Sequence, residues 1–273
     1  MSLHLSQIDR VKTITKNDFI KNYFEPQKPV VIEHFIEDWP AYSKWNLNYI
    51  KEVAGDKIVP LYDDRPVDYK DGFNEPHATM KMSEYVDLLK SKPTKFRIFL
   101  WNVLKEIPAL QKDFTFPDFG LRLMKGLPML FFGGTDSYTF MHYDIDLANI
   151  FHFHFEGKKE VILFDQKQNK YLYKIPHSLI VREDIDFSNP DFDKWPALKH
   201  AKGWVCNLNQ TFVKNKINKI KRSDYVEILF FYLVYRLDVS TDQCFIIGCY
   251  SSLCCRQLLY HGSWPWNTRQ CWK

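Results

Sequence analysis

A histidine and an aspartate two residues apart, inside an aromatic stretch, constrain this chain more than any other feature. His142 and Asp144 would point to the same face of a β-strand, because strand side chains alternate between faces. Their neighbours Phe140, Met141 and Tyr143 favour a strand over a helix. An imidazole and a carboxylate placed side by side supply two of the three protein ligands of a facial Fe(II) site. The spacing therefore predicts a strand that carries metal ligands.

The residues after this strand predict a further long stretch of sheet. Residues 149–164 contain an apolar and aromatic run, then a Glu-Gly pair, and then Lys159 at the start of a second apolar run. His152 and His154 share strand parity with His142, but they follow it by only ten and twelve residues. We therefore expect these two histidines to line the core or a pocket rather than to bind metal.

The order of these residues resembles the cupin-like JmjC family of Fe(II)- and 2-oxoglutarate-dependent oxygenases, in particular its branch of small protein hydroxylases. The family pattern is Thr-x-x-His-x-Asp, then Asn, then Gly-x-Lys before a strand that ends in Leu-Phe. In this chain the matching residues are Thr139, His142, Asp144, Asn149, Gly157, Lys159, Leu163 and Phe164.

The resemblance implies a role for each polar residue of the pattern. His142 and Asp144 would bind Fe(II), and no catalytic residue is implied beyond these metal ligands. Lys159 would pair with the distal carboxylate of the cosubstrate 2-oxoglutarate, and Thr139 would hydrogen-bond the same carboxylate. Asn149 would belong to the same cosubstrate site.

A lysine is a suitable partner for a buried carboxylate, which agrees with the role implied for Lys159. The alternative is a surface lysine in a Glu-rich turn, which is what we expect of Lys158.

Strand signals dominate the chain after a few helix signals. This order predicts a mostly β fold with N-terminal helices, an antiparallel jelly-roll, and the resemblance implies a cupin-type double-stranded β-helix. The expected helices cover residues 15–24, 46–54 and 83–89, and the expected early strands cover residues 29–33, 58–62, 96–101 and 129–134. In the family, the strand at 29–33 is the first element of the sheet.

The chain departs from the family pattern where the third iron ligand is expected. The segment from Gly203 to Leu208 matches the family, but a basic segment replaces the turn and ligand strand that should follow it. The sequence has no histidine between His200 and His261, and His261 lies some forty residues too late. The apolar run 228–235 is long enough to replace the missing strand, but it brings no imidazole. The jelly-roll is therefore expected to be incomplete at its C-terminal end.

Charge and cysteine content also change near residue 210. Residues 1–209 hold 28 Lys and Arg against 29 Asp and Glu, a net charge of −1, whereas residues 210–273 hold 9 against 4, a net charge of +5. All six cysteines lie at or beyond Cys206. We therefore divide the chain into a cupin-like domain, residues 1–209, and a divergent tail, residues 210–273.

Several interpretations of the tail stay open. Its cysteines form no Cys-x-x-Cys pair, which argues against a zinc site. The basic run Lys214 to Arg222 is more typical of a solvated helix face than of a nucleic-acid surface. An altered reading frame or an alternative exon would explain the abrupt changes.

Two functions compete at this stage. The first is an Fe(II)- and 2-oxoglutarate-dependent oxygenase that acts on a protein or peptide and is impaired by the missing ligand. The second is an inactive cupin-like scaffold that binds a partner; a metal-binding cupin of the isomerase or storage type is a weaker third. We expect nucleic acid not to be the partner. The chain shows neither a secretory signal nor an apolar run of membrane-spanning length, so we expect a cytoplasmic protein, with a nuclear location as the alternative. The oligomeric state is unknown.

Overall fold

The computed structural model describes residues 2–65, 76–123, 125, 128–142, 149–176, 180–210 and 228–234. Strands dominate these ranges, and the helices are short, which confirms the predicted mostly β, jelly-roll-like fold. Among the described residues, no helix is both long and apolar enough to cross a membrane.

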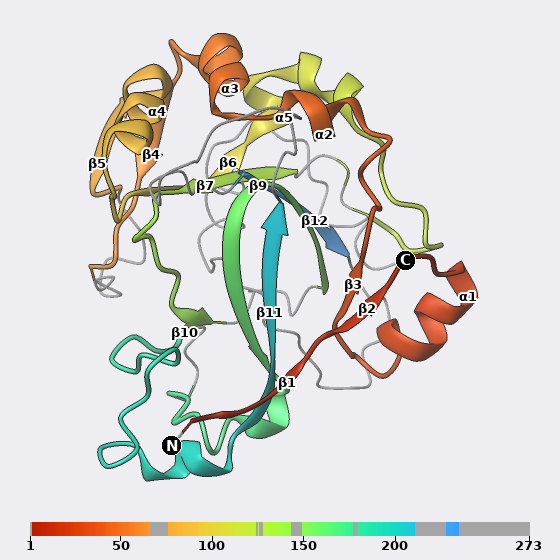
Figure 1. Cartoon of the computed structure of the whole chain (residues 1–273), viewed down its shortest axis with the longest axis vertical. Helices are drawn as coiled ribbons and strands as arrows, with labels where there is room; N and C mark the ends of the chain where they lie inside the picture. Colours follow the sequence, from red (N-terminus) through yellow and green to blue (C-terminus); the bar gives the residue numbers. More distant parts are fainter. Residues whose placement is uncertain are drawn as a thin grey trace, which may run out of the picture.

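One six-stranded sheet forms the centre of the molecule, with strand order β1-β11-β9-β12-β7-β6 (Figure 1). Its strands are β1 (His4–Gln7), β11 (Lys202–Gln210), β9 (Asn149–Phe164), β12 (Ile228–Val234), β7 (Met129–Gly133) and β6 (Arg97–Asn102). β1 runs parallel to β11, and the other neighbours are antiparallel.

Three strand pairs accompany the central sheet. The pair that carries His142 joins β8 (Met141–His142) to β10 (Ile180–Arg182) in antiparallel fashion. The others are β2 (Asp9–Val11) with β3 (Val30–Ile32), which is parallel, and β4 (Ile58–Leu61) with β5 (Ala78–Lys81), which is antiparallel.

The long strand β9 organises the sheet by curving through it (Figure 1). Gly157 has φ 93°, a left-handed conformation that glycine adopts at little cost, and it lies where β9 changes partner. β11 pairs with β9 up to Gly157 opposite Gln210, and β12 continues from Glu156 opposite Ile228. The predicted replacement strand therefore forms, and it lies between β9 and β7.

Side chains cap the helices largely as the sequence predicts. Thr15 accepts a hydrogen bond from the Asp18 N–H at the first helix, and Asn46 accepts bonds from the N–H groups of Asn48 and Tyr49 at another. The α-helices are α1 (Lys16–Phe19), α2 (Pro40–Lys44), α3 (Leu47–Ala54), α4 (Met82–Ser91) and α5 (Val103–Glu106). A π-helix, η1 (Ile20–Phe24), continues α1, and the 3₁₀ helices are η2 (Pro108–Asp113), η3 (Gln166–Gln168) and η4 (Pro196–His200).

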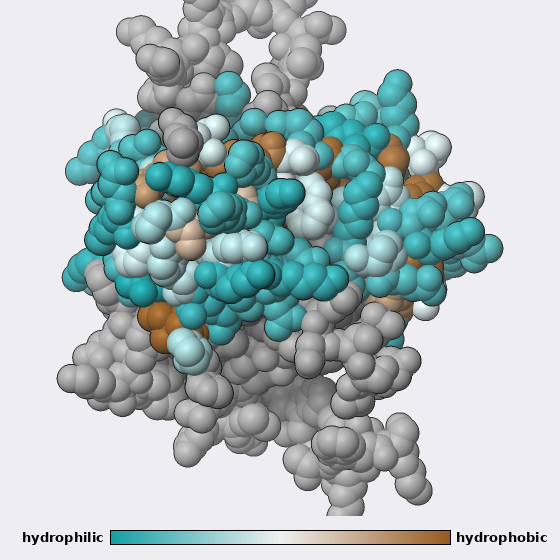
Figure 2. Space-filling view, turned by 90° about the horizontal axis from the view of Figure 1, so that it is seen from below, coloured by the Kyte–Doolittle hydropathy of each residue, from teal (hydrophilic) through white to brown (hydrophobic). Residues whose placement is uncertain are grey.

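Two hydrophobic cores lie against the sheet. In the first, Trp45 directly after α2, Ile50 from α3 and Tyr85 from α4 pack with Phe153 and Phe155 of β9. The Trp45 and Phe155 ring centroids are 5.0 Å apart. The second core joins the other half of β9 to the segments around β10 and η4. The face of the molecule seen in Figure 2 is mostly hydrophilic over its described residues.

The strand at residues 29–33 was expected to be the first element of the sheet, and this is wrong. β1 and β2 precede it, and β1 extends the central sheet beside β11. β1 has four residues and β2 has three, and both are mostly polar, so no period-2 apolar pattern marks them in the sequence.

Gly203 lets β11 approach β9 closely. A Cβ atom built at Gly203 would collide with the Leu163 carbonyl oxygen and the Phe164 ring. We expect Gly203→Ala to lower the free energy of unfolding by about 1–3 kcal/mol, the usual cost of overpacking a core. Urea titration measures this loss, with Lys202→Ala, an exposed neighbour in the same strand, as the control. Equal midpoints for the two variants would contradict the close approach.

Candidate functional site

His142 lies inside the protein, at the end of β8. His142 is 2% exposed, and its Nδ1 lies 2.6 Å from the Phe140 carbonyl oxygen. A carbonyl can only accept, so Nδ1–H is the donor and the neutral ring keeps its lone pair on Nε2. Histidines that bind metals commonly donate their second N–H to a backbone carbonyl in this way. This geometry fits the role of a metal ligand.

The surroundings of His142 keep its ring neutral. Burial is the main cause that lowers the pKa of His142 to about 4; the Phe140 carbonyl opposes this effect, and the positive charges of Arg97 and Lys159 add to it. A neutral imidazole is the form that binds a metal ion. The two cations also make this part of the interior favourable for an anion.

Lys159 and Lys158 differ as the sequence predicts for neighbours on opposite faces of a strand. Lys158 is exposed, whereas Lys159 is half-buried on β9, opposite Leu208 of β11. The charge of Lys159 lowers the pKa values of both His142 and His152. The cosubstrate role of Lys159 stays a prediction.

Arg97 is an interior residue of the predicted strand 96–101, and no role of its own is predicted for it from the sequence. It is 6% exposed on β6, and its Nη1 donates to the Asp63 carbonyl oxygen at 2.9 Å. Its charge acts on His142. A cation inside the apolar run Phe96-Arg-Ile-Phe-Leu-Trp101 was the available signal, because charged residues are rarely buried without a role or a partner.

The remaining predicted site residues are only partly placed. Thr139 is half-buried and precedes Phe140, and Asn149 is half-buried at the start of β9. Asp144 lies outside the described residues. No group of three His, Cys, Asp or Glu side chains suited to a metal occurs within the described part of the chain.

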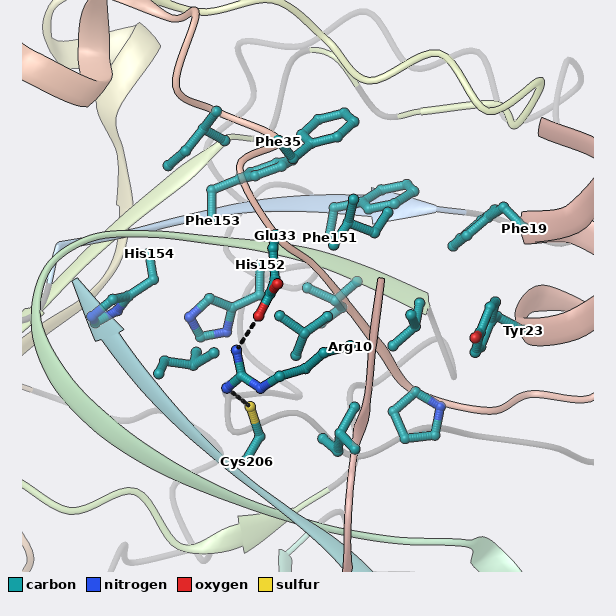
Figure 3. A pocket seen from close by; sticks show the side chains of 18 of the residues that line it. Arg10, Phe19, Tyr23, Glu33, Phe35, Phe151, His152, Phe153, His154 and Cys206 are labelled. Atoms are coloured by element: carbon teal, nitrogen blue, oxygen red, sulfur yellow. Dashed lines mark hydrogen bonds and ion pairs between the residues drawn. The ribbon is translucent and has the colours of Figure 1, made fainter. Parts of the chain in front are cut away.

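His152 and His154 line a cavity, as the sequence predicts. His154 is buried, and its Nε2–H donates to the Gly157 carbonyl oxygen at 3.0 Å. Burial holds the pKa of His152 well below its usual value, with smaller contributions from Lys159 and His154. Both residues line a cavity that β9 and β11 form together with the N-terminal segment (Figure 3).

The low pKa of His142 predicts a loss of stability in mild acid. Between pH 6.5 and about 4 the unfolded chain takes up a proton at this histidine that the folded chain does not, so the unfolding free energy falls as pH falls. We expect His142 to account for about 2 kcal/mol of this fall at pH 5.

Urea titrations of the native chain and His142→Asn at pH 7.5 and 5.0 measure that share. The variant should show the smaller decrease between the two pH values, and His34→Asn, at an exposed site, should follow the native chain. A His142→Asn profile as steep as the native one would be inconsistent with a buried neutral ring.

β12, the described strand that follows residue 210, contains no histidine, aspartate, glutamate or cysteine. It has the sequence Ile-Leu-Phe-Phe-Tyr-Leu-Val, and it pairs with β9 from Asn149 to Glu156. His261 lies outside the described residues. The lack of a third iron ligand therefore stays a prediction.

Comparison with known proteins places most of the described fold in one family. The model of the cupin-like domain family matches residues 16–211. The human tRNA wybutosine-synthesizing protein 5 is 26% identical over 224 residues, which cover 74% of this chain and 68% of the human protein.

Other relatives are JmjC-type demethylases. Lysine-specific demethylase 8 of Xenopus tropicalis is 26% identical over 201 residues, or 70% of this chain and 44% of the relative. Lysine-specific demethylase JMJ30 of Arabidopsis thaliana is 26% identical over 217 residues, or 77% of this chain and 49% of the relative. The chain thus spans less than half the length of these two relatives.

Proposed function

This chain belongs to the cupin-like, JmjC-type family, and we propose that it is an Fe(II)- and 2-oxoglutarate-dependent oxygenase with an impaired iron site. The observation that carries the proposal is His142: a buried, neutral imidazole whose Nδ1–H donates to the Phe140 carbonyl and whose pKa is lowered by burial and by the charges of Arg97 and Lys159. A metal ligand beside two positive charges suits a dianionic cosubstrate that chelates the metal.

The residues assigned to iron are His142 and Asp144, and those assigned to 2-oxoglutarate are Thr139, Asn149 and Lys159. Fe(II) with 2-oxoglutarate supplies the oxidising chemistry when both are bound, and the protein positions the reactants and excludes water. The burial of His142 supports the exclusion of water, because a residue that is 2% exposed lies away from bulk solvent. Hydrogen bonding to Phe140 fixes the direction of the ring.

Lys159 provides the direct test of the cosubstrate site. We expect Lys159→Ala to weaken 2-oxoglutarate binding about 10- to 100-fold, the cost of losing one charge-assisted hydrogen bond. Calorimetric titration with Mn(II) as a redox-inert metal measures the affinity. Lys158→Ala is the matched control, since it removes the same charge from the neighbouring, exposed residue. Equal affinities for the two variants would contradict the assignment of Lys159 to the cosubstrate site.

We propose a protein or peptide as the substrate. The two demethylases described above are named for lysine, whereas another relative is named for tRNA. Residues 1–209 carry a net charge of −1, which does not favour a polyanion such as tRNA.

A second candidate is a binding scaffold without turnover. The lack of an imidazole in β12 favours this candidate, because the chain has no histidine between His200 and His261, where the family pattern leads us to expect the third ligand. The two functions differ in whether iron-dependent succinate is formed.

A further inference from the structure

A cavity of about 530 Å³ lies between the N-terminal segment and the central sheet. β2, β3 and the α1–η1 segment form one side, and β9 and β11 form the other (Figure 3). Its size is within the range of small-molecule sites, which enclose about 300–1,000 Å³. Of the predicted site residues that the structure describes, Asn149 lines this cavity, whereas Thr139, His142 and Lys159 do not.

Aromatic rings from three separate segments form one wall of the cavity. Phe35 stacks on Phe153 at 5.9 Å with an interplanar angle of 20°, and on Phe119 at 5.7 Å with 24°. The ring of Phe151 makes an interplanar angle of 13° with Phe153 and of 16° with Phe119. Aromatic pairs in proteins are as often edge-to-face as stacked, so a layer of nearly parallel rings is a specific feature. A planar ligand would extend this layer.

The opposite end of the cavity is polar. The Arg10 guanidinium donates to the Asn207 carbonyl oxygen at 2.9 Å and to the Cys206 sulfur at 3.6 Å, and it lies 3.4 Å from the Glu33 carboxylate. The Arg10 side chain is still 44% exposed. Guanidinium N–H groups are donors only, and the Glu33 carboxylate is an acceptor, so this end offers both hydrogen-bonding partners.

His152 adds to the polar end from β9. Both His152 and His154 line the cavity, but only the His152 ring is directed toward Arg10 and Glu33 in Figure 3. The cavity is therefore lined by the hydrogen-bonding groups of Arg10 and Glu33 as well as by the stacked aromatic rings.

We propose that this cavity binds a planar heteroaromatic group of the nucleobase class, carried by a free nucleoside. Proteins bind bases by stacking them on aromatic rings and by hydrogen-bonding their polar edges, and the cavity provides both surfaces. A phenyl ring would stack but leave the polar end unmatched. The net charge of −1 over residues 1–209 favours a free nucleoside over a nucleic acid. The assignment needs neither iron nor 2-oxoglutarate, so it stands apart from the proposed oxygenase function.

Calorimetric titration of the full chain with adenosine, guanosine, cytidine and uridine, without metal, tests the proposal. Saturable binding of at least one nucleoside is expected, with N-acetyl-tyrosinamide bound at least about tenfold more weakly. The absence of saturable binding below about 10 mM would overturn the proposal. Equal binding of N-acetyl-tyrosinamide would overturn the nucleobase assignment. Tighter, steeply salt-dependent binding of a short oligoribonucleotide would overturn the assignment to a free nucleoside.

Matched variants place the ligand in this cavity. Phe35→Leu should weaken nucleoside binding roughly five- to hundredfold, the usual effect of losing one base–aromatic stack. Phe116→Leu is its control, because Phe116 is also half-buried and packs against the same core but does not line the cavity. Arg10→Gln should weaken binding roughly tenfold, whereas Arg122→Gln, at an exposed site, should not.

Unfolding of Phe35→Leu and Arg10→Gln would also weaken nucleoside binding, so a third variant fills the cavity instead. Val31→Phe adds volume to a half-buried cavity residue and should abolish nucleoside binding while the urea midpoint stays near the native value. Undiminished binding in Phe35→Leu, Arg10→Gln and Val31→Phe would show that the nucleoside binds elsewhere and would overturn the proposal.

Discussion

The purified chain, supplied with Fe(II), 2-oxoglutarate and ascorbate, is expected to form little or no succinate. The predicted iron ligands are His142 and Asp144, and the family pattern requires a third. Loss of one residue that merely supports a ligand already costs about 10- to 100-fold in metal affinity, so loss of an entire ligand should cost at least as much. The sequence has no histidine between His200 and His261, and β12 brings none to the sheet.

Iron affinity gives a readout that does not depend on turnover. We expect the chain to bind Fe(II) weakly under anaerobic titration, and His142→Ala to remove the remaining specific binding because its ring is one of the two predicted ligands. His34→Ala, at an exposed histidine far from β8 in sequence, should leave the binding unchanged. Succinate formation is measured in parallel on all three proteins.

Robust, iron-dependent succinate formation that disappears in His142→Ala would contradict the expected impairment. Such a result would require a third ligand from the chain, and His261 would be the first residue to replace. Succinate formation that persists in His142→Ala would instead contradict the assignment of His142 to the iron site.

The sequence was sufficient to predict the elements with strong local signals. The helix caps at Thr15 and Asn46 form as expected, because a side-chain oxygen before a helical run has a direct partner in the first-turn N–H groups. The apolar run at 228–234 forms a strand, since β-branched and aromatic residues with no charge suit the interior of a sheet. The difference between Lys158 and Lys159 follows from strand alternation alone.

Features that depend on distant contacts were not predictable in this way. The short strand β1 is held by its parallel partner β11, some two hundred residues later, and its own residues carry little strand signal. The place of β12 between β9 and β7 is likewise set by pairing, not by its composition. The cavity arises where Arg10 and Glu33 meet β9 and β11, so no single segment of the sequence indicates it.

Asp113 is another residue whose role only the structure shows, and its replacement should have the largest effect on stability. It is 4% exposed at the end of η2 and accepts hydrogen bonds from Lys44 Nζ at 2.7 Å, Trp45 Nε1 at 3.0 Å and the Tyr49 hydroxyl at 3.2 Å. Lys44 ends α2, and Tyr49 lies in α3. One carboxylate therefore holds three helical segments together above the sheet.

We expect Asp113→Ala to lower the free energy of unfolding by about 3–5 kcal/mol, the range for breaking a buried charged network. Trp45 is fully buried, so its indole N–H would lose its acceptor without gaining water in exchange. Urea titration measures the loss, and Asp118→Ala is the control, because the ion pair of Asp118 with Lys16 is exposed and should contribute at most about 1 kcal/mol. Asp113→Asn should fall between the two variants, since its amide oxygen still accepts a hydrogen bond while its NH₂ group faces donors. Equal midpoints for Asp113→Ala and Asp118→Ala would show that the helices are held by their apolar contacts and not by the carboxylate.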